Sequence, residues 1–249
     1  MDYAFAAIVF APALALGSFL NVVASRLPLG GSIVYPGSAC DVCSSEIRWY
    51  DNVPLLSYLV LRGRCRDCRT PIGWRHPAVE AATAALVVVC VLAYGVTLEA
   101  AAAAIFAVAL VVVTATDIER RVVPNRVVLP AAAAVLALRL LDHPSLEWPL
   151  AGLAAAGFLL AAALAYPGGM GMGDVKLALL MGVALGRVVP VALLVGMISA
   201  IVPSVVLFAR HGRAARKMAI PFAPFLALGS LVALFAGASL LHAYLGSFG

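Results

Sequence analysis

Long runs of apolar residues recur along the whole chain, and they decide what it can fold into. A run of about 20 apolar residues is the length that crosses a bilayer as an α-helix. Charged residues make up 12% of the chain and hydrophobic residues 64%, whereas soluble domains average about 25% and 45–50%. A soluble enzyme and a disordered chain are therefore excluded, and the sequence predicts an all-α polytopic membrane protein. About eight transmembrane helices are expected, over residues 3–25, 77–94, 98–116, 127–141, 149–166, 175–186, 188–209 and 221–245.

The basic residues predict how these helices are oriented. All 17 Lys and Arg residues except Arg139 and Arg187 fall in loops that the eight helices place on one side. The positive-inside rule assigns that side to the cytoplasm and the N-terminus to the outside. Each basic cluster adjoins an apolar run, so membrane orientation explains the charge better than nucleic-acid binding. The cytoplasmic loops are then 26–76, 117–126, 167–176 and 210–217.

Two details of this map have alternatives. Segment 3–25 is expected to stay as a helix, because Asp2 precedes it, no basic residue does, and no cleavage-like break follows. Segment 175–186 is short, and a re-entrant or broken helix is an alternative to a full span.

Four of the five cysteines form two paired motifs, Cys40-x2-Cys43 and Cys65-x2-Cys68, with 21 residues between the pairs. This pattern is typical of a tetrahedral zinc site with four thiolate ligands, which has no open position and is structural. Two disulfides are the alternative, but a reducing cytoplasm disfavours them. The polar loop has little core of its own, so a metal is expected to hold it together. Cys90 lies inside a predicted helix and is expected to be an inert packing residue.

Two aspartates stand apart from the other acidic residues, because Asp117 ends one apolar run and Asp174 begins another. Ionisable groups at membrane depth are candidates for function, and both fall at the cytoplasmic ends of predicted helices. A pair of such carboxylates suits aspartic-type hydrolysis, in which one accepts a proton from water and the other donates one. Ordinary helix-boundary aspartates are the alternative. Glycines 168, 169, 171 and 173 permit close backbone approach, although they equally describe a flexible loop.

Four blocks of sequence, in order along nearly the whole chain, carry a specific resemblance. They read GSFLNVV at 17–23 followed by RLP at 26–28, WYDNVPLLSYL at 49–59 followed by RGRCR, GMGDVKL at 171–177, and IPFAPFL at 220–226. The chain resembles the type IV prepilin peptidases, a family of GxGD aspartic membrane proteases. One departure is Ala223, where that family more usually has glycine.

The resemblance implies a bifunctional enzyme of the bacterial inner membrane. Such enzymes cleave the basic leader of type IV prepilins and of type II secretion pseudopilins at the cytoplasmic face, after a glycine. They then methylate the new N-terminal residue with S-adenosylmethionine. It implies Asp117 and Asp174 as the catalytic pair, with Gly171, Gly173 and Lys176 beside the substrate. The helix N-terminus favours Asp174 as the base and Asp117 as the acid, although desolvation could reverse that order.

The same resemblance divides the chain into three segments. Residues 1–25 form the first transmembrane helix, 26–76 the cytoplasmic zinc loop of the methylating form, and 77–249 the membrane protease domain. No glycine-rich fingerprint identifies residues that bind S-adenosylmethionine. A cleavage-only peptidase and, less favoured, a transporter are the alternatives. A transporter would need its acids at the membrane midplane and leaves the zinc loop unexplained. A scaffold without chemistry leaves the two aspartates without a role.

Overall fold

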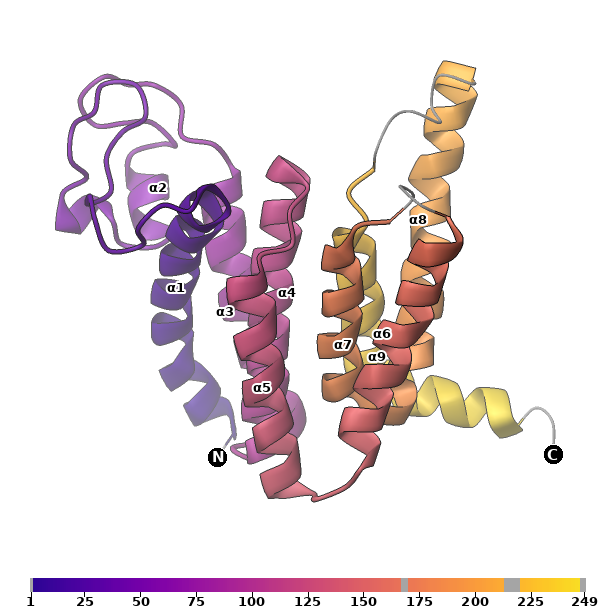
Figure 1. The fold of residues 1–249 in the computed structure, drawn as a ribbon. Coiled ribbons are helices and arrows are strands. Elements are labelled where there is room, and N and C mark those ends of the chain that lie inside the picture. The colour runs from indigo at the N-terminus through magenta and orange to yellow at the C-terminus, as the bar shows by residue number, and fades with distance from the viewer. Residues whose placement is uncertain (1, 167–169, 213–219, 247–249) are drawn as a thin grey trace. The chain divides into compact units, whose positions relative to one another are not determined.

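The computed structural model describes residues 2–166, 170–212 and 220–246, and these residues are mostly helical. They divide into two compact units, Met1–Ala100 and Ala101–Gly249, here called unit 1 and unit 2. The expectations for Gly168, Gly169 and the basic residues of 213–217 fall outside the described residues. The long helices are α1 (Asp2–Arg26), α3 (Arg75–Tyr94), α4 (Leu98–Arg120), α5 (Asn125–Asp142), α6 (Glu147–Ala165), α7 (Met172–Leu185), α8 (Val189–His211) and α9 (Ala223–Gly246) (Figure 1).

Unit 1 consists of two packed helices, α1 and α3, and the cysteine-rich loop that joins them. Gly17 lets the helices approach closely, because a Cβ at this position would lie 2.7 Å from Cα of Glu80. The amide of Asn21 donates a hydrogen bond of 3.0 Å to the carbonyl of His76, so the end of α1 lies beside the start of α3. The loop contains only short helices: η1 (Leu27–Leu29), η2 (Trp49–Asp51) and α2 (Leu56–Val60).

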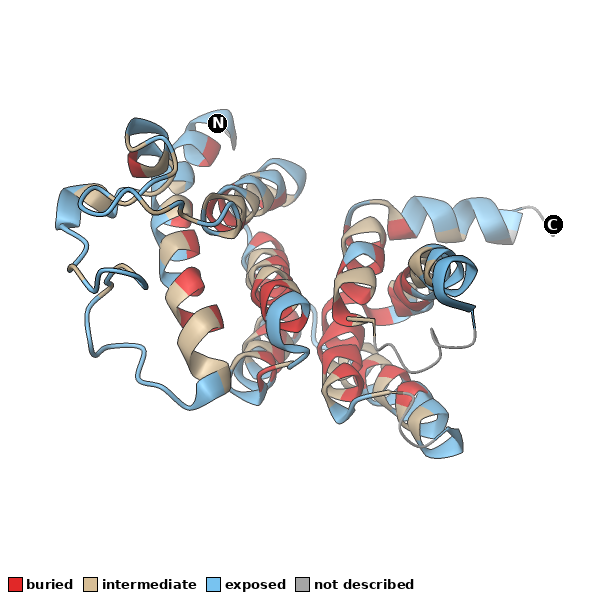
Figure 2. Cartoon of the chain, turned by 90° about the horizontal axis from the view of Figure 1, so that it is seen from above, coloured by how far each residue is buried: buried red, intermediate tan, exposed pale blue. Residues whose placement is uncertain are grey.

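Unit 2 is built around α7, in which ten of the 14 residues are buried (Figure 2). Glycines allow the helices of unit 2 to approach most closely at two places. A Cβ at Gly182 of α7 would collide with the carbonyl of Ala151 in α6, and a Cβ at Gly229 of α9 would collide with the carbonyl of Ala192 in α8. Small residues of this kind are how membrane helices pack, because lipid supplies no hydrophobic drive for their association.

The structure has a helix at each of the eight predicted segments. Within the described ranges, six helical stretches are long and apolar enough to cross a membrane. One of the six runs over Met172–His211 and contains both α7 and α8, which turn back on each other at η3 (Gly186–Val188) (Figure 1). The 14 residues of α7 span only about 21 Å, less than a bilayer core of about 30 Å. Helix α5 is not among the six; it carries Arg126, Arg139 and Asp142.

The two basic residues outside the predicted cytoplasmic loops lie at one end of unit 2. Arg139 is buried and donates a hydrogen bond of 2.9 Å to the carbonyl of Ala184, near the C-terminus of α7. Its guanidinium also lies 4.7 Å from the ring centre of Trp148. The backbone N–H of Arg187 donates to the Glu147 carboxylate. This end of α7 is opposite the end that carries Asp174.

Candidate active site and metal centre

The two candidate catalytic aspartates lie in unit 2, one near the C-terminus of its helix and the other near the N-terminus. Asp117 is in the last turn of α4 and Asp174 is in the first turn of α7. Both side chains are buried, with 6% and 9% of their surface exposed. They are also close enough for the charge of one to act on the other. The structure therefore brings together two acids separated by 57 positions in the sequence.

Asp117 is held by a backbone group of the 220–226 block, a contact that the sequence motif does not reveal. The N–H of Ala223, at the first residue of α9, donates a buried hydrogen bond of 3.0 Å to Oδ2 of Asp117. The first N–H groups of a helix have no partner within the helix, so a carboxylate there satisfies one of them. The bond fixes the orientation of the Asp117 carboxyl group and leaves its other oxygen for a second partner.

The two motif glycines differ in what surrounds them. A Cβ at Gly173 would lie 2.7 Å from Cβ of Val123, in the segment between α4 and α5. Gly171 has an ordinary extended backbone, with φ of −81°, and a Cβ there would approach Oδ2 of Asp174 to 3.7 Å. Gly173 is therefore needed for packing, whereas Gly171 keeps the space beside the Asp174 carboxylate open.

Lys176 follows Asp174 by two residues in α7, and its side chain is bonded to another part of unit 2. Its ammonium group donates a hydrogen bond of 2.9 Å to Oδ1 of Asn125, the first residue of α5, and the pair is exposed. Together with the contact between Gly173 and Val123, this bond holds the start of α7 against the segment that follows Asp117.

The four paired cysteines meet in one cluster in unit 1. The Sγ atoms of Cys40 and Cys68 are 3.7 Å apart and those of Cys43 and Cys65 are 3.9 Å apart. All four sulfur atoms lie within 4.8 Å of one another. Zinc–sulfur bonds of about 2.3 Å in a tetrahedron require sulfur atoms roughly 3.8 Å apart. The four thiols are free and can hold a metal ion, with no fourth position left for a substrate.

The two cysteine pairs sit in turns of the same geometry. In the first turn Cys40 N–H donates to the Ser45 carbonyl, and in the second Cys65 N–H donates to the Thr70 carbonyl, both at 2.9 Å. The residue after each second cysteine, Ser44 or Arg69, has a positive φ of about 60°. The repeated turn points both sulfur atoms of each pair to one centre.

Two hydroxyl groups favour the metal-binding form of two of the four thiols. Hydrogen bonding with Ser45 lowers the pKa of the Cys43 thiol. The equivalent contact with Thr70, whose hydroxyl lies 3.2 Å from the sulfur, lowers the pKa of Cys68 to about 6. Since the thiolate is the form that binds metals, both contacts favour coordination.

The loop is tied to the helices through Glu80, which the sequence presents as an ordinary acid in the first turns of a helix. The side chain is buried in α3, and Oε2 accepts a hydrogen bond of 2.8 Å from the backbone N–H of Leu55. Within the loop, Arg66 forms an ion pair with Asp51 through two hydrogen bonds. These contacts fix the position of α2 relative to α3.

Two family models match the chain, one on each unit. The model of the bacterial peptidase A24 N-terminal domain matches residues 12–94, which contain all four clustered cysteines. The model of the type IV leader peptidase family matches residues 104–208, which contain Asp117 and Asp174. The chain belongs to the type IV leader peptidase family. Its two matched regions agree with the division of the structure into unit 1 and unit 2.

Relatives within this family match the chain over most of its length. A protein of Bacillus subtilis (strain 168) named prepilin leader peptidase/N-methyltransferase is 35% identical, over 96% of this chain and 97% of its own. Proteins of the same name from Myxococcus xanthus (strain DK1622) and Burkholderia pseudomallei (strain 1026b) are 38% and 35% identical. The first match covers 72% of this chain and 55% of the relative, the second 95% and 86%. No solved structure gives a significant match.

Proposed function

We propose that the protein removes the leader peptide from prepilins and pseudopilins and methylates the new N-terminal residue. The observation that carries the proposal is the buried pair Asp117 and Asp174 at one end of unit 2. The relatives from Bacillus subtilis and Myxococcus xanthus are named for both activities. The test is to incubate the purified protein with prepilins and S-adenosylmethionine and to weigh the products. Loss of the leader and a gain of one methyl group is the expected result; intact substrate would contradict the proposal.

Cleavage uses the two carboxyl groups as one unit. The ionised group takes a proton from a water molecule, and the water oxygen attacks the carbonyl carbon of the scissile bond. The protonated group gives its proton to the carbonyl oxygen, and the intermediate then collapses with protonation of the leaving amine. The Ala223 N–H holds Asp117 in place. Because the two groups interact, the shared proton is assigned to the pair rather than to either residue.

The substrate binds with its scissile bond at the membrane boundary. A prepilin has a basic leader followed by an apolar helix, so the helix stays in the bilayer while the leader stays in water. Asp117 and Asp174 lie in end turns of their helices, at the level where such a bond would be. Gly171 leaves room beside Asp174 for an extended peptide, and the half-buried Lys176 lies near the headgroups.

Methylation belongs to unit 1 in this proposal. The spacing of the four sulfur atoms and their thiolate chemistry fit zinc, which Cys40, Cys43, Cys65 and Cys68 would hold. Zinc would supply structure to the loop rather than chemistry, because a site closed by four thiolates offers no open position. S-adenosylmethionine would supply the methyl group, and we assign no residue to its binding.

The two motif glycines give a matched pair of variants. We expect Gly173→Ala to lower the cleavage rate by about a hundredfold, because the added methyl group displaces α7 from Val123 and a 1 Å error in a catalytic group has an effect of about this size. We expect Gly171→Ala to keep more activity, since its methyl group meets nothing closer than 3.7 Å. Cleavage rates and thermal melting of the two variants measure this. Equal or reversed losses would refute the packing argument.

The orientation of the loop is also a proposal, with the cysteines on the cytoplasmic side and the N-terminus outside. After metal removal, a membrane-impermeant thiol reagent applied to intact cells should leave Cys40 and Cys65 unlabelled, and should label them once the cells are opened. Leu146→Cys is the control, because this exposed residue lies in the short connection between α5 and α6, on the opposite side of the predicted map. Labelling of the loop cysteines in intact cells would reverse the map.

A further inference from the structure

Seven arginines lie in the segment 26–76, and they fall into two groups. Four donate hydrogen bonds to other groups of unit 1, namely Arg26, Arg48, Arg66 and Arg75. The other three are exposed, and their guanidinium groups have no hydrogen-bond or ion-pair partner anywhere in the described part of the chain. These are Arg62, Arg64 and Arg69. Four guanidinium groups therefore form hydrogen bonds within unit 1, and three guanidinium groups form none.

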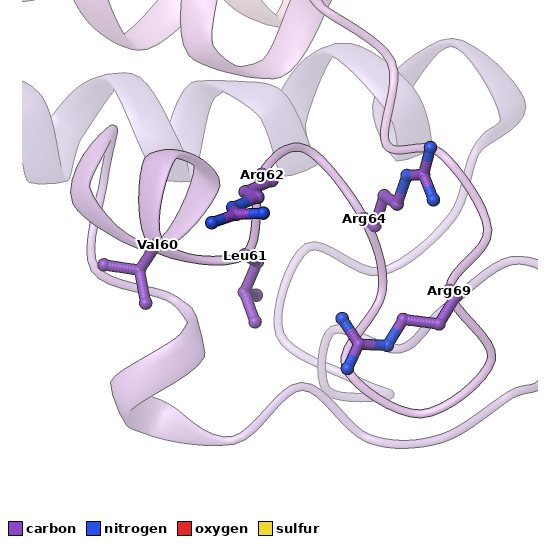
Figure 3. A pocket seen from close by; sticks show the side chains of 5 residues that line it. All are labelled: Val60, Leu61, Arg62, Arg64 and Arg69. Atoms are coloured by element: carbon purple, nitrogen blue, oxygen red, sulfur yellow. The ribbon is translucent and has the colours of Figure 1, made fainter.

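The three unpaired arginines line a single pocket. Its volume is about 420 Å³, and Val60 and Leu61 complete the lining (Figure 3). Guanidinium groups provide planar donors that match the oxygens of a phosphate or carboxylate. The positive charge of three arginines that line one space attracts an anion. The pocket thus has the chemistry of an anion site with an apolar edge.

The apolar edge continues onto the outer face of α2. Leu56, Leu59 and Val60 are 59%, 70% and 68% exposed, and their spacing puts them on one face of the helix. The opposite face carries Ser57, which is buried and donates a hydrogen bond of 2.9 Å to the Tyr50 carbonyl. The short helix therefore turns its polar residue inward and three large apolar side chains outward, the reverse of a helix that faces water.

The depth of α2 explains this reversed orientation. Helix α3 is one of the stretches able to cross a membrane, and Glu80 is buried in it. Glu80 lies five residues after the first residue of α3, Arg75, which is about 7.5 Å along the helix axis. The bond from Leu55 N–H to Glu80 holds the start of α2 at that level. A helix at this depth meets lipid headgroups and the first acyl carbons, where an apolar face is stabilised.

We propose that α2 and the pocket of Arg62, Arg64 and Arg69 bind an anionic phospholipid. The lipid phosphate lies among the three guanidinium groups, and its acyl chains lie against Leu56, Leu59 and Val60. The charges of the pocket complement an anionic headgroup, and the adjoining apolar face complements the chains. An acidic protein segment would use the arginines but leave the three apolar side chains in water. The site would fix the zinc loop to the membrane surface.

The test measures lipid binding to the intact, purified protein by native mass spectrometry, with phosphatidylglycerol and phosphatidylcholine as the probes. We expect the wild-type protein to prefer phosphatidylglycerol. The triple variant Arg62→Gln, Arg64→Gln, Arg69→Gln should lose that preference by about a hundredfold, and Arg64→Gln alone by about fivefold, because each arginine near an anionic surface contributes roughly 1 kcal/mol. Zinc content serves as the check that the loop is folded.

Arg66→Gln is the matched control, since it removes the same charge from the same loop at a guanidinium already paired with Asp51. It should keep the preference for phosphatidylglycerol. An equal loss in Arg66→Gln and Arg64→Gln, or a preference that survives in the triple variant, would overturn the proposal. Binding of inorganic phosphate or polyglutamate as tightly as phosphatidylglycerol would also overturn it, in favour of a soluble anion or an acidic segment. If the triple variant loses its zinc, the single variants Arg62→Gln and Arg64→Gln carry the test.

Discussion

Prepilin cleavage is expected to fall by about 10⁴-fold or more in Asp117→Asn and equally in Asp174→Asn, and the double variant should be hardly worse than either one. Groups that act as a unit lose their whole contribution when one of them is removed. Asparagine keeps the shape of the side chain, and its carbonyl oxygen can still accept the Ala223 N–H bond, so the variants should fold. The measurement is the rate of leader removal from a purified prepilin.

Glu119→Gln is the matched control for this experiment. It neutralises an exposed acid on α4, two residues beyond Asp117, and should cleave at the wild-type rate. Methylation of a supplied pre-cleaved pilin should survive in both aspartate variants, because the cysteine cluster lies in unit 1. Measurable cleavage by either folded single variant would show that the pair is assigned to the wrong carboxylate.

The second large effect concerns the cysteine cluster. The wild-type protein should contain one zinc ion per chain, and replacing any one of Cys40, Cys43, Cys65 or Cys68 with serine should abolish stoichiometric binding. Binding free energies of structural zinc sites are about 10–16 kcal/mol, and that energy folds the segment around the metal. The loop should then be cut by proteases that spare the wild-type loop, and methylation should fall more than cleavage.

Cys90→Ala is the control, because this fifth cysteine is buried in α3 and outside the cluster. It should retain zinc. Elemental analysis that finds no stoichiometric metal in the wild-type protein would refute the zinc assignment. Methylation at the wild-type rate in a variant lacking both cysteine pairs would instead refute the link between the loop and methylation, and would favour a separate methylation site.

The sequence predicts the helices and the cysteine cluster because their patterns are local. Apolar runs mark each long helix, and two cysteines separated by two residues determine the turn that holds them. The turn also explains Ser45 and Thr70, which stand at the same place after each pair and contact the thiols. The position of the two aspartates follows as well, since each stands where an apolar run meets a loop.

Four contacts could not be predicted, because each joins distant parts of the chain without a side-chain pattern. The Ala223 N–H that holds Asp117 belongs to the block at 220–226, but nothing in that block shows that its backbone contacts Asp117. Glu80 stands in the first turns of a helix, where an acid is ordinary, and its role depends on where the loop places Leu55. Gly182 and Gly229 are two of 21 glycines, and only the packed helices show that they have no room for a side chain.

The bond between Ala223 and Asp117 has a consequence for the order in which the protein matures. Its two ends are 106 residues apart in the chain. A ribosome that has inserted α4 must still synthesise four more long helices before the N–H group that orients the carboxyl group exists. The packed pairs α6–α7 and α8–α9 are neighbours in sequence and can associate as they enter the bilayer. The candidate active site is therefore completed last, so an unfinished chain lacks the bond that orients Asp117.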